Sequence, residues 1–303
     1  MSWMLIFVIA AIILIPVIQE VQRRPMDSLA REGAPGQFAE LPQGVTHYQW
    51  FGPVRGPLFV CVHGLTTPSF VWRRMVPGLA LLGFRVLVYD HYGRGYSDRP
   101  RGLQDRVFFQ RHLNDLLEHL GVQDQKFTLL GYSMGGAIVA CYAAAHPEKV
   151  SRLILLAPAG MTLLPSGMVK VMRDVPILGD WIMRALYPAT LRKGIKAESE
   201  PEIGPLQENE LSYRGYLSAV LSSLRGVLAK DQSEEHAFLA EKGVPVLSIW
   251  AADDDVIPLR CKNTLEKWNK DAIQPVIERA GHGLAYTHAD QVVAEIATFK
   301  DMR

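Results

Sequence analysis

The chain has 303 residues, 49% of them hydrophobic, and its 32 basic residues nearly balance its 31 acidic ones. A chain of this length can bury a core in one large α/β domain, or in two smaller domains, without disulfides or metals. Neither charge collects into a long run, which argues against a nucleic-acid partner. The three cysteines, Cys61, Cys141 and Cys261, lie far apart without metal-ligand spacing, so we expect buried thiols and no metal site.

Residues 1–24 differ from the rest of the chain because residues 3–18 are apolar throughout. About sixteen residues is just under the ~17 to 25 expected of a bilayer-spanning helix. A cleaved signal peptide would need basic residues before the run and small residues after it, and neither is present. We therefore predict an uncleaved membrane anchor, with a signal peptide of an exported protein, or a buried helix, as alternatives. Arg23, Arg24 and Arg31 follow the run and place the folded domain on the cytoplasmic side.

Residues 25–44 are rich in proline, glycine and charge, which predicts a linker. After the linker, short apolar runs alternate with helical patterns. The runs typical of strands are residues 46–50, 58–63, 85–90, 126–130, 152–157, 244–250 and 274–278. The helical patterns include residues 108–120, 136–145, 259–269 and 289–300. Continuously apolar strands fit a parallel sheet covered on both faces, so we predict a doubly wound α/β fold over residues 45–159 and 239–303.

Residues 160–238 separate two predicted strands by far more than one crossover helix needs. This segment is therefore predicted to be a helical cap with a core of its own. Its apolar residues include several methionines and Trp181. A flexible, methionine-rich underside could also line a pocket as a lid, and both interpretations can hold together.

The stretch Gly131-Tyr132-Ser133-Met134-Gly135 stands between a predicted strand and an alanine-rich helix. A Gly-x-Ser-x-Gly turn in this setting strains its central residue and exposes the serine oxygen above the sheet. The glycines let the neighbouring strand and helix approach closely. Ser133 is therefore the candidate nucleophile, and it needs a base, an orienting acid and oxyanion donors.

Position in the chain separates the nine histidines as candidate bases. In open α/β sheets the site lies beyond the carboxyl ends of the strands. His282 closely follows the last predicted strand and stands between two glycines, which makes it the best candidate. His288 is its main competitor. The remaining histidines lie in helices, in early strands, in the cap or in other loops, and they are weaker candidates.

Asp253, Asp254 and Asp255 follow the strand that ends at Trp250 and supply the orienting acid. The chain order serine, aspartate, histidine is the order that accompanies a nucleophile elbow. For the oxyanion, the backbone N–H of Met134 can converge with one from the loop after residues 58–62, where we choose Leu65. His63 in that loop could be taken for a second base, but its place indicates a turn-stabilising role.

Four blocks of the chain resemble the α/β-hydrolase superfamily, over nearly everything from residue 45 onward. They are His63-Gly64 with Trp72 downstream, the run from Asp90 to Ser97, the elbow around Ser133, and Gly281-His282 after the three-aspartate loop. In the family the acid stands four residues before the proline of that loop, which here is Pro258, and this selects Asp254. Ala251 and Ala252 depart from the usual residues, so Asp253 and Asp255 stay open.

The resemblance also implies a cap at residues 160–238 and a serine esterase or lipase that needs no metal or organic cofactor. The predicted substrate-binding residues are His63, Trp72, Tyr132 and Trp181. Dehalogenases and epoxide hydrolases of the family carry aspartate at the elbow, so Ser133 argues against both activities. Carbon–carbon hydrolases carry a glycine-rich loop where this chain has Leu65-Thr66-Thr67-Pro68.

We therefore expect a carboxylic ester hydrolase that forms an acyl-enzyme and takes a lipophilic small-molecule ester, such as a monoacylglycerol. Thioesterase, lactonase, cofactor-free haloperoxidase and carbon–carbon hydrolase activities are alternatives on the same triad. A catalytically silent binding protein of this fold is the alternative from a different class. The sequence does not determine the oligomeric state.

Overall fold

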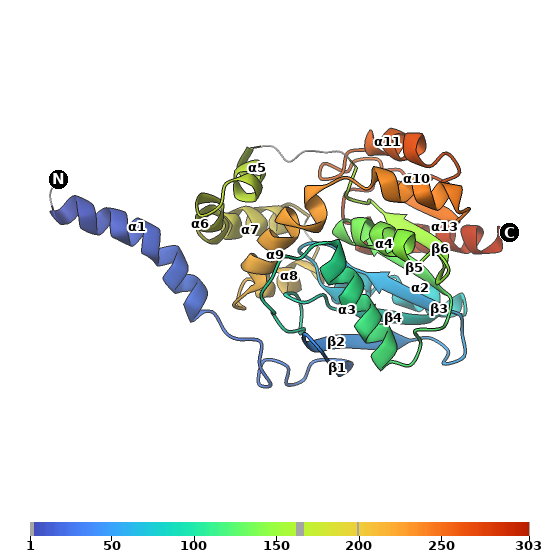
Figure 1. The fold of residues 1–303 in the computed structure, drawn as a ribbon, viewed down its shortest axis with the longest axis horizontal. Helices are drawn as coiled ribbons and strands as arrows, with labels where there is room; N and C mark the ends of the chain where they lie inside the picture. The colour runs from blue at the N-terminus through green and yellow to red at the C-terminus, as the bar shows by residue number, and fades with distance from the viewer. Residues whose placement is uncertain (1–2, 162–166, 199, 303) are drawn as a thin grey trace.

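The computed structural model describes residues 3–161, 167–198 and 200–302 of the chain. An eight-stranded sheet with the order β1-β2-β4-β3-β5-β6-β7-β8 lies at its centre (Figure 1). β1 and β2 pair antiparallel, β2 is antiparallel to β4, and the remaining neighbours are parallel. The strands are β1 (Gln37–Leu41), β2 (Gly44–Phe51), β3 (Leu58–Val62), β4 (Arg85–Tyr89), β5 (Phe127–Tyr132), β6 (Val150–Leu156), β7 (Val246–Ala251) and β8 (Val276–Ile277).

A buried hydrophobic cluster lies against each face of this sheet. The helices on one face are α3 (Arg106–His119), α4 (Met134–Ala145), α10 (Ser233–Glu241) and α11 (Cys261–Trp268). The elements on the other face are η1 (Ser69–Trp72), α2 (Val76–Leu81), α12 (Leu284–Thr287) and α13 (Ala289–Asp301). Every residue of β3, β5 and β7 is buried, because parallel strands under two helical layers have no solvent face. The doubly wound fold expected from the apolar runs is confirmed.

A group of short helices forms a cap between the sheet and the N-terminal helix (Figure 1). Its elements are α5 (Gly167–Asp174), α6 (Leu178–Ala185), α7 (Tyr187–Glu198), α8 (Gly204–Glu210), α9 (Tyr216–Arg225) and η2 (Val227–Ala229). A separate hydrophobic cluster that includes Met172, Met183 and Tyr216 holds the cap together. α10 packs instead against α4 and α11, with Leu239 in the core of the sheet domain. The predicted boundary at residue 238 was therefore too late, since the core resumes at α10.

The segment predicted as a linker, residues 25–44, contains β1. β1 forms a hairpin with β2 in which Leu41 pairs with Gly44, and Pro42 and Gln43 make the turn. Only Ala39 and Leu41 of β1 are buried. An edge strand with two inward side chains carries almost no hydrophobic pattern, so its pairing with β2 is what defines it.

The N-terminal helix α1 (Trp3–Gln22) has 20 residues, four more than the apolar run of residues 3–18. It is the helix among the described residues that is long and apolar enough, by length and composition, to cross a membrane. Pro16 and Glu20 are its buried residues, and its other side chains are largely exposed.

Candidate active site

Ser133 occupies a sharp turn between β5 and α4, with φ 54° and ψ −120°. This region of backbone space is unfavourable for a residue with a Cβ, so the surrounding contacts must hold it. The Ser133 N–H donates to Leu156 O at 2.9 Å, and its carbonyl accepts from the N–H groups of Gly136 and Ala159. A Cβ on Gly135 would collide with the Val62 carbonyl oxygen, so the turn needs glycine there. Neighbouring strands thus hold the strained serine in place.

A continuous hydrogen-bonded relay joins the three predicted catalytic side chains. His282 Nε2 lies 3.0 Å from Ser133 Oγ, and His282 Nδ1 lies 2.8 Å from Asp254 Oδ2. The three residues follow β5, β7 and β8, so the carboxyl edge of the sheet brings them together. In this geometry the imidazole can accept the serine proton on one nitrogen while the carboxylate holds the other.

The aspartate loop presents Asp254 and turns its two neighbours outward. The Asp254 side chain is inaccessible to solvent, whereas Asp253 and Asp255 are exposed. Asp254 Oδ1 accepts from the N–H groups of Val256 and Ile257 at 2.8 and 2.7 Å. These donors fix the carboxylate and leave its second oxygen for His282. The geometry therefore singles out Asp254 from the three adjacent acids.

The two predicted oxyanion residues both line the cavity that contains Ser133. Met134 is the first residue of α4, and the first N–H groups of a helix have no intrahelical acceptor. The Leu65 carbonyl accepts from Arg94 Nε at 3.2 Å, which anchors the loop that carries Leu65. A helix N-terminus beside the serine adds a favourable electrostatic field for negative charge.

Arg94 is a residue whose importance the sequence reasoning missed. It is fully buried, and burial lowers its pKa to about 10. Besides Leu65, its guanidinium donates to Tyr92 O, to Ala219 O and to Ser223 Oγ, and it contacts Gln104 Oε1. Arg94 therefore ties the oxyanion loop to cap helix α9. Its place in the block Asp90 to Ser97, which carries part of the family resemblance, was the available signal.

None of the four predicted substrate contacts is among the residues that line the cavity beside Ser133. His63 is fully buried, accepts from the His91 N–H and donates to Gly64 O, and burial lowers its pKa to about 4. Trp72 is the last residue of η1, is buried, and lines a different cavity. The Tyr132 hydroxyl donates to His282 O and supports the catalytic loop from below. Trp181 contacts the N-terminal helix instead. Aromatic and imidazole groups near the motifs thus serve as supports.

The cavity over Ser133 has a volume of about 1040 Å³ and lies between the sheet edge and the cap. Its apolar wall comes from the core and the cap and includes Leu65, Met161, Val169, Leu224, Leu228, Val256 and Ile257. Charged side chains of both signs also line it, namely Arg106, Arg173, Lys230, Arg260, Asp231, Glu234, Glu235 and Asp255. Such a cavity suits a substrate with an apolar part and a polar part.

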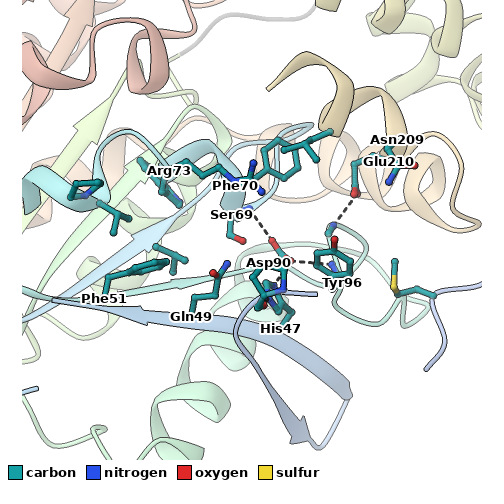
Figure 2. Close-up of a pocket in the computed structure, with 18 of the residues that line it drawn as sticks. His47, Gln49, Phe51, Ser69, Phe70, Arg73, Asp90, Tyr96, Asn209 and Glu210 are labelled. Carbon is teal, nitrogen blue, oxygen red and sulfur yellow. Dashed lines mark hydrogen bonds and ion pairs between the residues drawn. The ribbon is translucent and has the colours of Figure 1, made fainter. Parts of the chain in front are cut away.

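A second cavity of about 410 Å³ is lined by none of the three candidate catalytic side chains (Figure 2). His47 and Asp90 form a buried ion pair at its floor, with Nδ1 and Oδ2 2.7 Å apart. Asp90 also accepts from the N–H groups of Ser69 and Tyr96. This network joins β2, η1 and the loop after β4, so its evident role is to fix these elements.

Glu210 of α8 lies at the wall of the second cavity and is buried. Burial raises its pKa from 4.5 to about 7, against the opposing effect of Arg99, and its Oε2 accepts from the Gly95 N–H at 2.9 Å. Because the folded pKa lies above the unfolded one, this contribution to stability is complete below pH 4.5 and is lost as the pH rises through about 7. A shift of this size corresponds to something on the order of 3 kcal/mol.

We therefore expect Glu210→Gln to lose less stability than the wild type between about pH 5.5 and about pH 8.5. The glutamine amide oxygen can still accept from Gly95, while its charge no longer changes with pH. Denaturant midpoints at the two pH values measure the effect. Glu208→Gln on the exposed face of α8 is the matched control and should follow the wild type. Parallel curves for Glu210→Gln and wild type would contradict the expectation.

Within the described ranges, no three His, Cys, Asp or Glu side chains are grouped so that they could hold a metal ion.

The chain resembles a putative non-heme chloroperoxidase from Synechocystis sp., with 29% identity over 247 residues, covering 78% of this chain and 88% of that protein.

Two solved structures show the same fold at lower identity. The enol-lactonase from Burkholderia xenovorans LB400 superposes with a TM-score of 0.74 at 21% identity, over 88% of this chain and 100% of the other. A bacterial membrane phospholipase A superposes with a TM-score of 0.72 at 20% identity, over 99% of this chain and 97% of the other. The family model of the alpha/beta hydrolase fold matches residues 57–289, and the chain belongs to this family.

Proposed function

We propose that this chain is a serine hydrolase that cleaves carboxylic esters through an acyl-enzyme. The observation that carries the proposal is the relay from Ser133 Oγ through His282 to Asp254, with distances of 3.0 and 2.8 Å. A relay of this kind makes a neutral hydroxyl nucleophilic by removing its proton as the new bond forms. Relatives of the same family whose names include hydrolase support hydrolysis as the class of reaction.

In the proposed reaction Ser133 Oγ attacks the ester carbonyl, and its proton passes to His282 Nε2. The backbone N–H groups of Met134 and Leu65 stabilise the oxyanion, and Asp254 stabilises the imidazolium. The proton then moves from His282 to the departing alcohol oxygen. Water attacks the acyl-enzyme by the same route and regenerates the serine.

We propose a lipophilic ester as the substrate. The apolar wall of the large cavity and the apolar helix α1 support this choice. We also propose that α1 attaches the protein to a membrane, with the arginines after it favouring the cytoplasmic side. The likeness to the membrane phospholipase A, which extends over 99% of this chain, supports both the lipophilic substrate and the membrane attachment.

Hydrolysis of esters with graded acyl length tests the substrate class. We expect kcat/KM for p-nitrophenyl esters to rise from acetyl to medium-length chains, because each buried methylene adds roughly 0.8 kcal/mol of binding. A monoacylglycerol should be hydrolysed as well. A sharp optimum at acetate would contradict the lipophilic substrate while leaving the ester chemistry intact.

A lactone is the second candidate substrate, favoured by the likeness to the enol-lactonase. Lactone opening uses the same acyl-enzyme with the leaving alcohol still attached to the acyl group. Including a lactone and a thioester in the same panel separates these activities. Turnover of the lactone alone would overturn the preference for open-chain esters.

A further inference from the structure

The cap contacts α1 at two points and the chain just after α1 at a third. The Trp181 indole Nε1 donates to the Ile12 carbonyl at 2.9 Å. Farther along α1, Glu20 Oε1 accepts from the Gly215 N–H at 2.8 Å. After the helix ends, Arg24 bonds by its backbone to Ser212 and Arg214. Figure 1 shows α1 passing beside α6, with its N-terminal part directed away from the rest of the protein. These contacts fix the position of α1 along its axis relative to the cap.

The Trp181 contact compensates for a missing backbone hydrogen bond in α1. In an α-helix the carbonyl of residue 12 accepts from the N–H of residue 16, but residue 16 is proline and has no N–H. An unpaired carbonyl is costly in an apolar medium, where no water can replace the donor. The indole N–H supplies the missing donor to the Ile12 carbonyl, and Pro16 is one of the two buried residues of α1. The contact is thus specific to this point of the helix.

The position of this contact along α1 limits where the cap can lie relative to a bilayer. The helix portion beyond the contact is residues 3–11, which at about 1.5 Å per residue is roughly 14 Å long. The hydrocarbon core of a bilayer is about 30 Å thick. If the cap stayed wholly in water, the free part of α1 would be too short to reach past the midplane of the bilayer. If the Trp181–Ile12 hydrogen bond persists when α1 is in the membrane, the start of α6 must therefore lie close to the lipid.

The corner between α5 and α6, residues 175–178, carries apolar side chains suited to that position. Val175, Ile177 and Leu178 are exposed, and Ile177 is 85% exposed although it is a large hydrophobic residue. Ile177 also has φ 65°, a region that disfavours β-branched residues. Ile177 directly precedes α6, and the Trp181 backbone N–H in the first turn of α6 donates to the Ile177 carbonyl at 2.9 Å. The start of α6 therefore carries both the tryptophan that contacts α1 and an exposed isoleucine.

Polar contacts behind the corner hold it rigid. Arg225 of α9 donates to the carbonyls of Met172 and Arg173 and pairs with Asp180 at 2.8 Å. The backbone of Gly179 packs so closely on the Met172 carbonyl that a Cβ would collide with it. The same helix α5 supplies Val169 and Arg173 to the wall of the catalytic cavity. A movement of the corner would therefore also move the part of the cavity wall that α5 forms.

We propose that the α5–α6 corner of the cap inserts into the surface of a lipid bilayer beside a tilted α1. The partner is the boundary between headgroups and acyl chains, which accepts isolated apolar side chains and tryptophan. This insertion holds the catalytic cavity against the membrane, so that a lipid substrate reaches Ser133 without crossing water. The proposal rests on the proposed membrane attachment, and it does not depend on the ester chemistry.

An environment-sensitive label at Ile177 tests the insertion. In the full-length protein, Ile177→Cys is labelled with the fluorophore NBD and mixed with phosphatidylcholine–phosphatidylglycerol liposomes, and flotation measures binding. We expect a blue-shifted emission that lipids brominated near the headgroup quench. The native cysteines are buried, so the unsubstituted protein gives the labelling background. Leu81→Cys is the matched control, because Leu81 is 89% exposed on helix α2 of the sheet domain, and its label should keep a water-like emission.

The outcomes separate the attachment from the insertion. Protein that floats with the liposomes but shows a water-like label at residue 177 overturns the insertion alone. Protein that fails to float overturns the attachment and the insertion together. Absence of ester hydrolysis in a floating, blue-shifted protein would overturn the proposed reaction and leave the insertion standing.

Replacing Trp181 tests the coupling between α1 and the cap. Trp181→Phe keeps an aromatic ring but removes the donor to the Ile12 carbonyl, so we expect a smaller blue shift at residue 177 with unchanged flotation. Trp3→Phe, at the exposed far end of α1, is the control and should change neither measurement. An unaltered label environment in Trp181→Phe would overturn the assignment of Trp181 as the residue that positions the cap.

Discussion

Ser133→Ala is expected to lower kcat for ester hydrolysis by about a millionfold, the loss seen when a triad serine is removed from a serine protease. The reason is that the side chain that forms the acyl bond is gone, so no other group can replace it. Initial rates with a p-nitrophenyl ester measure the loss. Labelling by a fluorophosphonate probe should disappear in the same variant.

Folding should be unaffected by this change. The Ser133 side chain forms a hydrogen bond with His282, and the strained backbone of the turn is equally accessible to alanine. An unchanged thermal midpoint is therefore the control. A folded wild type that neither hydrolyses esters nor reacts with the probe would overturn the serine hydrolase proposal in favour of a silent member of the family.

Asp254→Asn is expected to lower kcat by roughly 10⁴-fold, because an amide can hold the imidazole in the wrong tautomer and cannot stabilise its positive charge. Steady-state rates with the same ester measure the effect. Asp253→Asn is the matched control, since Asp253 has the same chemistry one position earlier but is exposed, outside the relay and not among the residues that line the cavity beside Ser133. It should retain most of the activity.

A larger loss in Asp255→Asn, or in Asp253→Asn, than in Asp254→Asn would show that the acid loop takes another arrangement in the working enzyme. Asp254 Oδ1 also accepts two backbone N–H groups, so some loss of stability accompanies its replacement. The denaturation midpoint of each variant separates that loss from the loss of catalytic rate.

Local sequence patterns were enough to predict the strands other than β1, to select Ser133 and His282 as candidates, and to narrow the candidate acid to three adjacent aspartates. Continuously apolar runs predicted the parallel strands, because a strand covered on both faces needs apolar residues at every position. The Gly-x-Ser-x-Gly turn predicted Ser133 at a strand end, since only glycine tolerates such close backbone approach. The order of the chain then led to His282 and the aspartate loop. The structure brings these groups within hydrogen-bonding distance, and their catalytic roles remain predictions to be tested.

Features that depend on long-range contacts could not be predicted in this way. β1 is defined by its pairing with β2, and the assignment of α10 to the core depends on its packing against α4. His63 was assigned to substrate binding because it stands beside a motif, but burial directs its ring to backbone partners. Proximity along the chain does not say which way a side chain points.

The sequence by itself determined which chemistry is available to this protein, since residue types and local turns set the candidate nucleophile, the candidate base and the apolar N-terminal helix. Only the tertiary structure decided which aspartate meets His282, which cavity contains Ser133 and which partner Trp181 finds. The physical reason is that side-chain identity and backbone turns are local properties. Orientation, burial and the pairing of Trp181 with a carbonyl 169 residues earlier arise only when distant segments pack together.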